Sequence, residues 1–204
     1  MIKILTVSDV TERTLYPALD AHELRKVELI LSCGDLPPEY LASLVNSIGA
    51  PLYYVRGNHD IRYDTKPPQG CLDLHARVVT FRGLKILGLE GSMWYSGGPQ
   101  QYTEQQMRRL IRRLRPLIWW RGGIDVVITH APPRGVHDEQ DLCHQGFKSF
   151  LWLIRKYKPR YFIHGHIHRS FNAPSERISI IDATQVINTY GYHLLEIEDE
   201  ERRS

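Results

Sequence analysis

The segment Leu52–Asp60, LYYVRGNHD, contains the change of character that decides the fold. Its first four residues are aliphatic or aromatic and favour a short buried strand. The next five, Arg56-Gly57-Asn58-His59-Asp60, are polar and include a glycine, which predicts a loop where the strand ends. Polar side chains at the end of a strand are typical of ligand sites in α/β proteins.

The same pattern recurs on both sides of this segment. Strands are predicted at 2–7, 29–32, 125–129 and 161–163, and polar residues follow them: Asp9, Asp35, His130, and the pair His166 and His168. Because strand ends in an open α/β sheet gather at one edge, we expect these groups to lie close together. Carboxylate, amide and imidazole ligands together suit divalent first-row metals. Taken singly, such an aspartate would more often cap a helix, and such a histidine would more often be structural.

Helical and strand patterns alternate along the rest of the chain. Helices are predicted at 15–26, 38–48, 103–115 and 147–156, and further strands at 77–81, 84–89, 178–181, 185–188 and 193–197. This order predicts an α/β fold, namely a four-layer α-β-β-α sandwich of two mixed sheets with outer helices. The absence of a linker or repeat predicts a single domain over residues 1–204.

Composition limits the class of protein. The 42% apolar and 24% charged residues are typical of a globular domain, and no apolar run is long enough to predict a membrane span. No signal-peptide pattern follows Met1, so a cytoplasmic location is expected. Three scattered cysteines do not predict a disulfide framework, and Cys33 is expected to be a core residue.

The net charge of +3 is only mildly basic, but six arginines cluster between Arg108 and Arg121. A solvated helix face is the more usual reading of such a run. A surface that attracts phosphate-bearing ligands is the alternative.

The motifs in their order resemble those of the calcineurin-like metallophosphoesterase superfamily. They read Ser8-Asp9, Gly34-Asp35, Gly57-Asn58-His59-Asp60, Thr129-His130 and Gly165-His166-Ile167-His168. Each motif is weak alone, whereas the ordered set is specific. The resemblance implies two divalent metal ions, with manganese favoured and iron, zinc, cobalt or nickel as alternatives.

The resemblance also implies a role for each residue. Asp35 would bridge the metals, Asp9 and His168 would hold the first, and the second would be held by Asn58, His130 and His166. His59 would protonate the leaving oxygen, although fixing the loop is an alternative role. The implied reaction is hydrolysis of a phosphodiester or phosphomonoester by attack of a metal-bound hydroxide.

Two positions depart from the family pattern. Thr11 stands where an imidazole would bind the first metal, and a hydroxyl is a poorer ligand. Waters could complete a weaker first site, Glu12 could substitute, or the first site could often be empty. Pro38 stands where many members carry an acidic residue that orients the catalytic histidine; Glu39 or Asp60 could replace it.

Substrate contacts are predicted near the metals. Asp60, Trp94 and Tyr95 are the candidates, although Trp94 and Tyr95 could equally be packing residues of a long loop. The remaining histidines near the motifs, His75, His137, His144 and His164, are expected to be structural, although His75 or His137 could approach the substrate.

Three hypotheses about function remain. A phosphoesterase acting on a small phosphate ester is favoured, because six of seven ligand positions and His59 are present. A non-catalytic scaffold with a partly eroded metal site is the alternative from another class. A nuclease is not favoured, because nucleases of the superfamily tend to carry extra domains; its only support is the arginine cluster.

Overall fold

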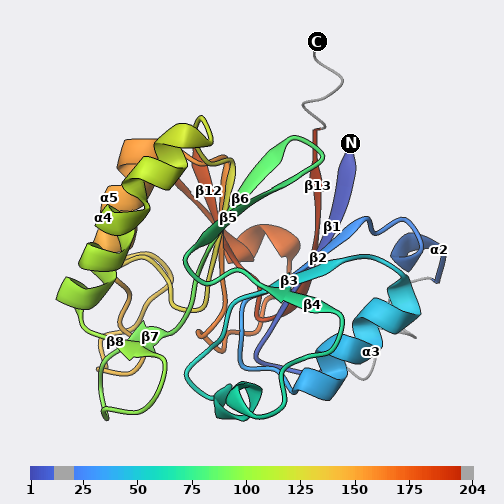
Figure 1. The fold of residues 1–204 in the computed structure, drawn as a ribbon, viewed down its shortest axis with the longest axis horizontal. Coiled ribbons are helices and arrows are strands. Elements are labelled where there is room, and N and C mark those ends of the chain that lie inside the picture. Colours follow the sequence, from blue (N-terminus) through green and yellow to red (C-terminus); the bar gives the residue numbers. More distant parts are fainter. Residues whose placement is uncertain (12–20, 199–204) are drawn as a thin grey trace.

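Two mixed β-sheets pack face to face in the computed structural model, which describes residues 1–11 and 21–198 (Figure 1). The first sheet combines an antiparallel edge strand with four mutually parallel strands. Its order is β13 (Gly191–Ile197), β1 (Ile2–Ser8), β2 (Leu29–Ser32), β3 (Leu52–Tyr54) and β4 (Cys71–Asp73).

The second sheet has parallel strands at its centre and an antiparallel strand at each edge. Its order is β11 (Ile178–Ile181), β12 (Thr184–Asn188), β10 (Tyr161–His164), β9 (Val126–Thr129), β6 (Leu84–Leu89) and β5 (Arg77–Phe81). A small parallel pair, β7 (Ser92–Met93) and β8 (Gln101–Tyr102), lies in the loop after β6.

Helices cover the outer faces of both sheets. The first sheet is covered by α2 (Ala21–Leu24) and α3 (Pro38–Ile48), and the second by α4 (Glu104–Trp120) and α5 (Lys148–Tyr157) (Figure 1). Two short 3₁₀ helices, η1 (Ile61–Asp64) and η2 (Pro174–Arg177), lie in loops. The predicted four-layer α-β-β-α sandwich is therefore confirmed.

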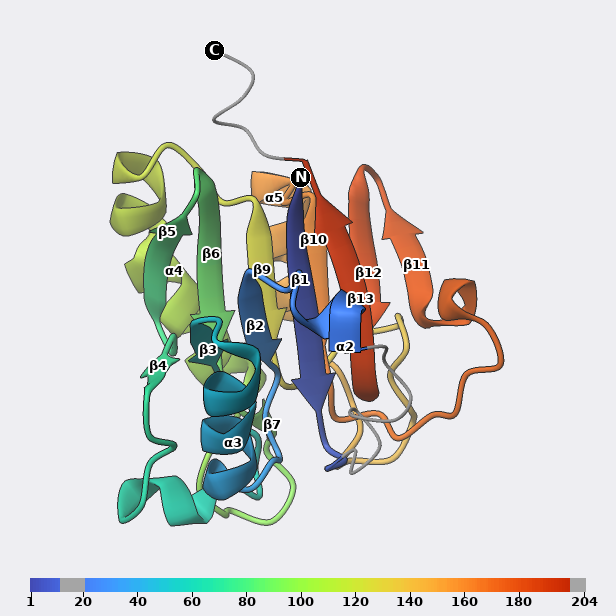
Figure 2. The ribbon, with the colours of Figure 1, turned by 90° about the vertical axis from the view of Figure 1, so that its right-hand side faces the viewer.

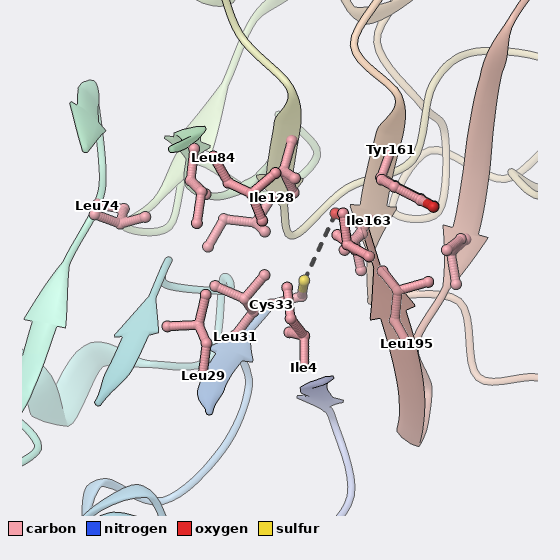
Figure 3. Close-up of a cluster of buried hydrophobic side chains, with 14 of the residues drawn as sticks. Ile4, Leu29, Leu31, Cys33, Leu74, Leu84, Ile128, Tyr161, Ile163 and Leu195 are labelled. Atoms are coloured by element: carbon pink, nitrogen blue, oxygen red, sulfur yellow. Dashed lines mark hydrogen bonds between the residues drawn. The ribbon is translucent and has the colours of Figure 1, made fainter. Parts of the chain in front are cut away.

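Alternation of apolar side chains along the strands builds three core layers. On β1, Ile4 points between the sheets and Leu5 points toward the helices, and both are fully buried. Figure 3 shows the layer between the sheets, where Leu31 faces residues of the second sheet such as Ile128. Cys33 lies in this layer with its thiol 3.6 Å from the carbonyl of Ile163, so its prediction as a core residue is confirmed.

The helix α4 extends five residues beyond the predicted end at Arg115. It starts with a capping box formed by Thr103 and Gln106, and it continues through Pro116. The final turn is held because Ile118 is buried against the second sheet, which outweighs the hydrogen bond lost at the proline.

Several short elements were not predicted, namely β4, β7, β8 and both 3₁₀ helices. Each is too short to carry a periodic pattern. The predicted helix at 15–26 is seen only as α2, because residues 12–20 lie outside the described part. Among the described residues, no helix has the length and apolar character that a membrane crossing requires.

Candidate active site

The ends of five strands bring the predicted site residues to one edge of the sandwich. Asp9, Asp35 and Asn58 follow β1, β2 and β3, whereas His130 and His166 follow β9 and β10. In Figure 2, β1, β2 and β6 all point toward this lower edge. Three of the residues, Asp9, Asp35 and His166, have left-handed φ angles of 65°, 57° and 69°. Such strained backbone gathers at functional sites, where the surrounding structure holds it in place.

Asp35, His130 and His166 form the centre of the cluster. Each offers one ligand atom, and the three atoms lie within 4.8 Å of one another. Nε2 of His130 lies 3.1 Å from Oδ1 of Asn58 and 3.3 Å from Oδ2 of Asp35. His130 itself is completely buried.

The tautomer of His130 follows from its other nitrogen. Nδ1 lies 2.7 Å from the carbonyl oxygen of Cys33, and a carbonyl can only accept, so Nδ1 carries the hydrogen. In the neutral ring, Nε2 then presents a lone pair toward the oxygens of Asn58 and Asp35. Three electron-pair donors facing one point need a cation between them, which is either a proton or a metal ion.

His166 is oriented in the same way. Its Nε2 lies 2.6 Å from the carbonyl oxygen of Cys143, so Nε2 carries the hydrogen and Nδ1 is the nitrogen with a lone pair. Its ring centroid lies 4.7 Å from that of His130. Metal-binding histidines usually donate their second ring hydrogen to a carbonyl or carboxylate, and both rings fit that arrangement.

Burial and the charges of neighbouring groups set the pKa values in the cluster. Burial alone would lower the pKa of His130, but the negative charge of Asp35 and the contact with it outweigh burial and raise that pKa to about 9. Burial and the nearby His130 lower the pKa of His166 to about 4, so His166 stays neutral. Burial raises the pKa of Asp35, yet the charge of His130 reverses this and leaves that pKa below its ordinary value. The donors present therefore fit a divalent cation, which would take the place of the proton on His130.

Glycines allow the loops to approach this closely. A Cβ atom at Gly57 would overlap the carboxylate of Asp35 and would lie 2.7 Å from Cε1 of His130. A Cβ atom at Gly165 would lie 2.6 Å from Oδ2 of Asp9. Any larger residue at either position would displace a candidate ligand.

Asp9 and His168 lie beside this centre. The buried carboxylate of Asp9 accepts the backbone N–H of His166, at 3.0 Å, and Nε2 of His168 lies 3.4 Å from Oδ1 of Asp9. The His168 side chain is 59% exposed and stacks on Tyr190. Thr11 is exposed, and Glu12, the predicted substitute ligand, lies outside the described residues.

Asp60 holds two loops together. Its Oδ2 accepts the backbone N–H groups of Asp35 and Gly57, both at 2.8 Å, and the side chain is buried. Burial and the negative charge of Asp35 raise the pKa of Asp60 to about 7. Asp60 is 4% exposed and lines a hollow that His59 also lines, so its predicted contact with a substrate stays a prediction beside its role in holding the loops.

His59 lies on the exposed side of the cluster. Its backbone N–H donates to Oδ1 of Asp35 at 2.9 Å, and its side chain borders a hollow of about 210 Å³ that Asp35 and Arg62 also line. Glu39, a predicted partner for His59, instead binds Arg62 at 2.7 Å and Lys66 at 2.8 Å. The structure thus leaves the His59 imidazole facing the open side of the site.

Tyr95 contacts a candidate ligand, which its sequence position did not indicate. Its hydroxyl accepts a hydrogen bond from Nδ2 of Asn58 at 3.2 Å, which turns Oδ1 of Asn58 toward His130. Trp94 is 53% exposed on the same loop. Among the described residues, no ring or cation contacts Trp94.

The additional histidines serve the loops around the site. Nδ1 of His137 lies 2.9 Å from Nε2 of His164, and Nε2 of His137 lies 2.8 Å from the Ser179 hydroxyl. Burial lowers the pKa of both histidines, that of His137 to about 4, so both rings stay neutral. The chain of hydrogen bonds anchors the loop that carries Cys143.

Asp141, Cys143 and His144 form a second group of metal-type ligands in that loop. Their closeness has a local explanation, because Oδ1 of Asp141 accepts the backbone N–H groups of Cys143 and His144, both at 3.1 Å. The carbonyl contacts of Cys33 and Cys143 were missed by sequence reasoning, because a backbone oxygen leaves no signature in the residue type.

The fold and the cluster define an α/β sandwich whose strand ends hold a buried set of metal-type ligands. The sequence pattern of the calcineurin-like phosphoesterase family matches residues 2–170. The chain belongs to that family, whose members are metal-dependent hydrolases of phosphate esters.

Individual relatives are more distant. Human metallophosphoesterase domain-containing protein 1 is 28% identical over 109 residues, which are 52% of this chain and 32% of the relative. The chain therefore spans about a third of the length of the curated relatives it matches.

Solved structures share the fold. The protein TT1561 of Thermus thermophilus has a TM-score of 0.59 at 16% identity, with 100% of this chain and 96% of that chain covered. The calcineurin-like phosphoesterase YfkN of Bacillus subtilis has a TM-score of 0.51 at 15% identity, with 97% and 86% covered.

Proposed function

We propose that this chain hydrolyses a phosphodiester or phosphomonoester with the help of two divalent metal ions, manganese being the favoured ion. Asp35, Asn58, His130 and His166 would hold the second metal. Asp9, Asp35 and His168 would hold the first, more weakly. The ions would lower the pKa of a water and offset charge on the phosphoryl oxygens.

The observation that carries this proposal is the paired orientation of His130 and His166. Each ring donates one hydrogen to a backbone carbonyl and so keeps one nitrogen with a lone pair, and a ligand atom of each ring lies within 4.8 Å of the other and of Asp35. A proton on Nε2 of His130 would satisfy its two acceptors, on Asn58 and Asp35, but it would still leave the lone pair of the neutral His166 ring beside them. The cluster therefore supports a cation site better than a structural polar core.

The chain's own residues would perform the remaining steps. His59 borders the hollow beside Asp35, where a phosphate ester could place its leaving group. There the His59 imidazole would donate a proton to the leaving oxygen. Asp60 would hold the backbones of Asp35 and Gly57 at the correct separation.

Hydrolysis of bis-p-nitrophenyl phosphate and p-nitrophenyl phosphate tests the reaction directly. The metal-stripped protein should be inactive, and manganese or another of the named ions should restore turnover of at least one substrate. Metal shown bound by elemental analysis, with no turnover of either substrate under any of these ions, would contradict the proposal and favour the non-catalytic scaffold.

The variant His59→Ala tests the proton donor. It should lower kcat by roughly 10²–10⁴-fold, the usual contribution of general acid–base catalysis, while metal affinity stays the same. A substrate with a nitrophenolate leaving group needs less protonation, so the loss should be larger for an alkyl phosphate ester. Equal losses for both esters, or parallel loss of metal, would argue that His59 only fixes the loop.

A further inference from the structure

The outer face of α4 and α5 combines cations with exposed aromatic rings, and we call it the α4–α5 face. On α4, Arg108, Arg112, Arg115 and Trp119 follow one another at spacings of four, three and four residues, so they form one stripe along the helix. The neighbouring α5 contributes Trp152 and Lys156. Figure 1 shows the two helices side by side on the outside of the second sheet.

Two hollows follow this stripe between the helices. One of about 120 Å³ lies between Arg108 and Trp152, and one of about 570 Å³ lies among Arg112, Arg115, Trp119 and Lys156. Both are lined by cations and by an indole ring. A ligand that occupied them would therefore meet positive charge and a flat apolar surface in alternation.

The positive charge of this face is not balanced. Within the described part of the chain, none of Arg108, Arg112, Arg115 and Lys156 forms an ion pair. Glu104 is the acidic residue that borders the smaller hollow, and its carboxylate is engaged by the backbone N–H groups of Lys148 and Ser149 at 2.9 and 2.8 Å. The phosphate-attracting alternative for the arginine cluster thus gains support from the structure.

Trp119 distinguishes this surface from an ordinary solvated helix face. Its side chain is 82% exposed, and among the described residues no ring or cation contacts it. By contrast, Trp152 is contacted by Tyr157 and by Lys156, and Trp120 by Arg121. An exposed indole is costly in water, and Trp119 offers a ring face for stacking.

Two ligand classes carry phosphate with apolar groups, and the geometry separates them. A membrane-surface helix buries a continuous apolar side in lipid, whereas the apolar side of α4, with Met107, Ile111 and Leu114, is buried against the second sheet. A nucleic acid duplex hides its base faces within the stack, so Trp119 would find no partner. A single strand exposes both its phosphates and its base faces.

We propose that the α4–α5 face binds single-stranded nucleic acid, with phosphates on Arg112 and Arg115 and a base stacked on Trp119. The proposal goes beyond the hydrolytic function and does not depend on it. The face begins two residues after β8, in the continuation of the loop that carries Tyr95, so a bound strand would run from the neighbourhood of the candidate active site along α4.

Binding of a fluorescein-labelled 20-nucleotide oligo(dT), followed by fluorescence anisotropy without added divalent metal, tests this proposal. Affinity should fall as salt rises, as expected when phosphates displace counterions. Arg112→Ala/Arg115→Ala should weaken binding by at least about tenfold and lower the steepness of the salt dependence by about 1.4, because two phosphate contacts of a single strand are lost. The matched control Arg25→Ala/Lys26→Ala removes the same charge from exposed residues after α2 and should leave binding unchanged.

Two substitutions of Trp119 test stacking. Trp119→Leu should weaken binding by about tenfold, because the base loses its stacking partner, whereas Trp119→Phe should retain most of the affinity. Thermal melting of every variant checks that these exposed changes leave the fold intact.

Several outcomes would overturn the proposal: no binding of oligo(dT), equal binding by the α4 double variant and its control, or tighter binding of a duplex of the same length. Binding to phosphatidylserine-containing vesicles, with none to oligo(dT), would reassign the face to a membrane. The nitrophenyl phosphate assays read hydrolysis separately, so failure of one proposal leaves the other measurable.

Discussion

The two halves of the candidate metal site differ in how deeply their candidate ligands are buried and in how well hydrogen bonds fix them. On the second-metal side, His130 is fully buried, and both His130 and His166 are fixed by backbone carbonyls. On the first-metal side, His168 is 59% exposed and Thr11 replaces an imidazole. Since a preorganised site loses less entropy on binding, the difference predicts that the second position fills before the first.

The largest effect should come from removing one imidazole on each side. His130→Ala should abolish metal at the second position and reduce hydrolysis to background, because it removes a ligand from the buried half. His168→Ala should leave the second metal in place and remove metal only at the first position, and it should also lower turnover, because the proposed reaction uses both ions. Elemental analysis after gel filtration, combined with turnover, checks both; equal metal loss in the two variants would remove the distinction between the halves.

Adding the missing imidazole on the first-metal side should have the next largest effect. Thr11→His adds a neutral nitrogen ligand, so first-metal affinity should rise by about 100-fold, the upper end of the range for partners of ligands. Calorimetric titration with manganese should then show two tight steps in place of one. Thr11→Ser is the matched control, and an unchanged titration in Thr11→His would indicate that another residue already completes the first site.

The contact between Tyr95 and Asn58 should have a smaller effect. Tyr95→Phe removes the hydroxyl that accepts from Nδ2 of Asn58, so the amide can rotate its oxygen away from the second metal. Metal affinity at that position should fall by about tenfold, the lower end of the range for such partners. Trp94→Phe on the same loop is the control. A rise in KM alone, with unchanged metal affinity, would instead assign Tyr95 to the substrate.

The smallest effect concerns pH in the metal-free protein. Folding raises the pKa of His130 from 6.5 to about 9, despite burial, because of Asp35; burial and Asp35 raise that of Asp60 from 3.8 to about 7. Stability from such groups is complete below the unfolded pKa and is lost as pH rises through the folded value. The melting temperature should therefore drop by several degrees between pH 6.5 and 9.

Metal affinity should show the opposite trend over the same pH range. The proton and the metal compete for Nε2 of His130, so affinity should rise with pH. Scanning calorimetry with and without manganese at each pH measures both trends. A metal-free protein whose stability rises across this interval would contradict the assigned proton on His130.

The sequence predicted the fold well where patterns were long. Alternating apolar strands and the helical period of α3, α4 and α5 led to the confirmed four layers, whereas the two-residue strands β7 and β8 carry no pattern. At the site, strand-end positions predicted that Asp35, His130 and His166 would meet, and the structure places their ligand atoms within 4.8 Å. Their roles as ligands stay predictions.

Asp60 shows why other features of the site could not be predicted from the sequence. Its place in the Gly57–Asp60 motif suggested a substrate contact, but the two backbone N–H groups that its carboxylate accepts, those of Asp35 and Gly57, became visible only once the loops were packed together. The arginine cluster on α4 is a similar case. Its arginines were visible in the sequence, but the hollows with Trp152 and Lys156 exist only because α5 packs alongside.

The sequence by itself determined which chemical groups stand at the strand ends and that Thr11 lacks an imidazole, because these are properties of residue type and local period. Only the tertiary structure decided how those groups are oriented. The carbonyl of Cys33 lies 97 residues before His130 in the sequence. The carbonyl of Cys143 lies 23 residues before His166. Contacts between backbone oxygens and side chains depend on how the segments pack. That packing fixes the rings of His130 and His166 on the second-metal side, whereas His168 on the first-metal side is exposed.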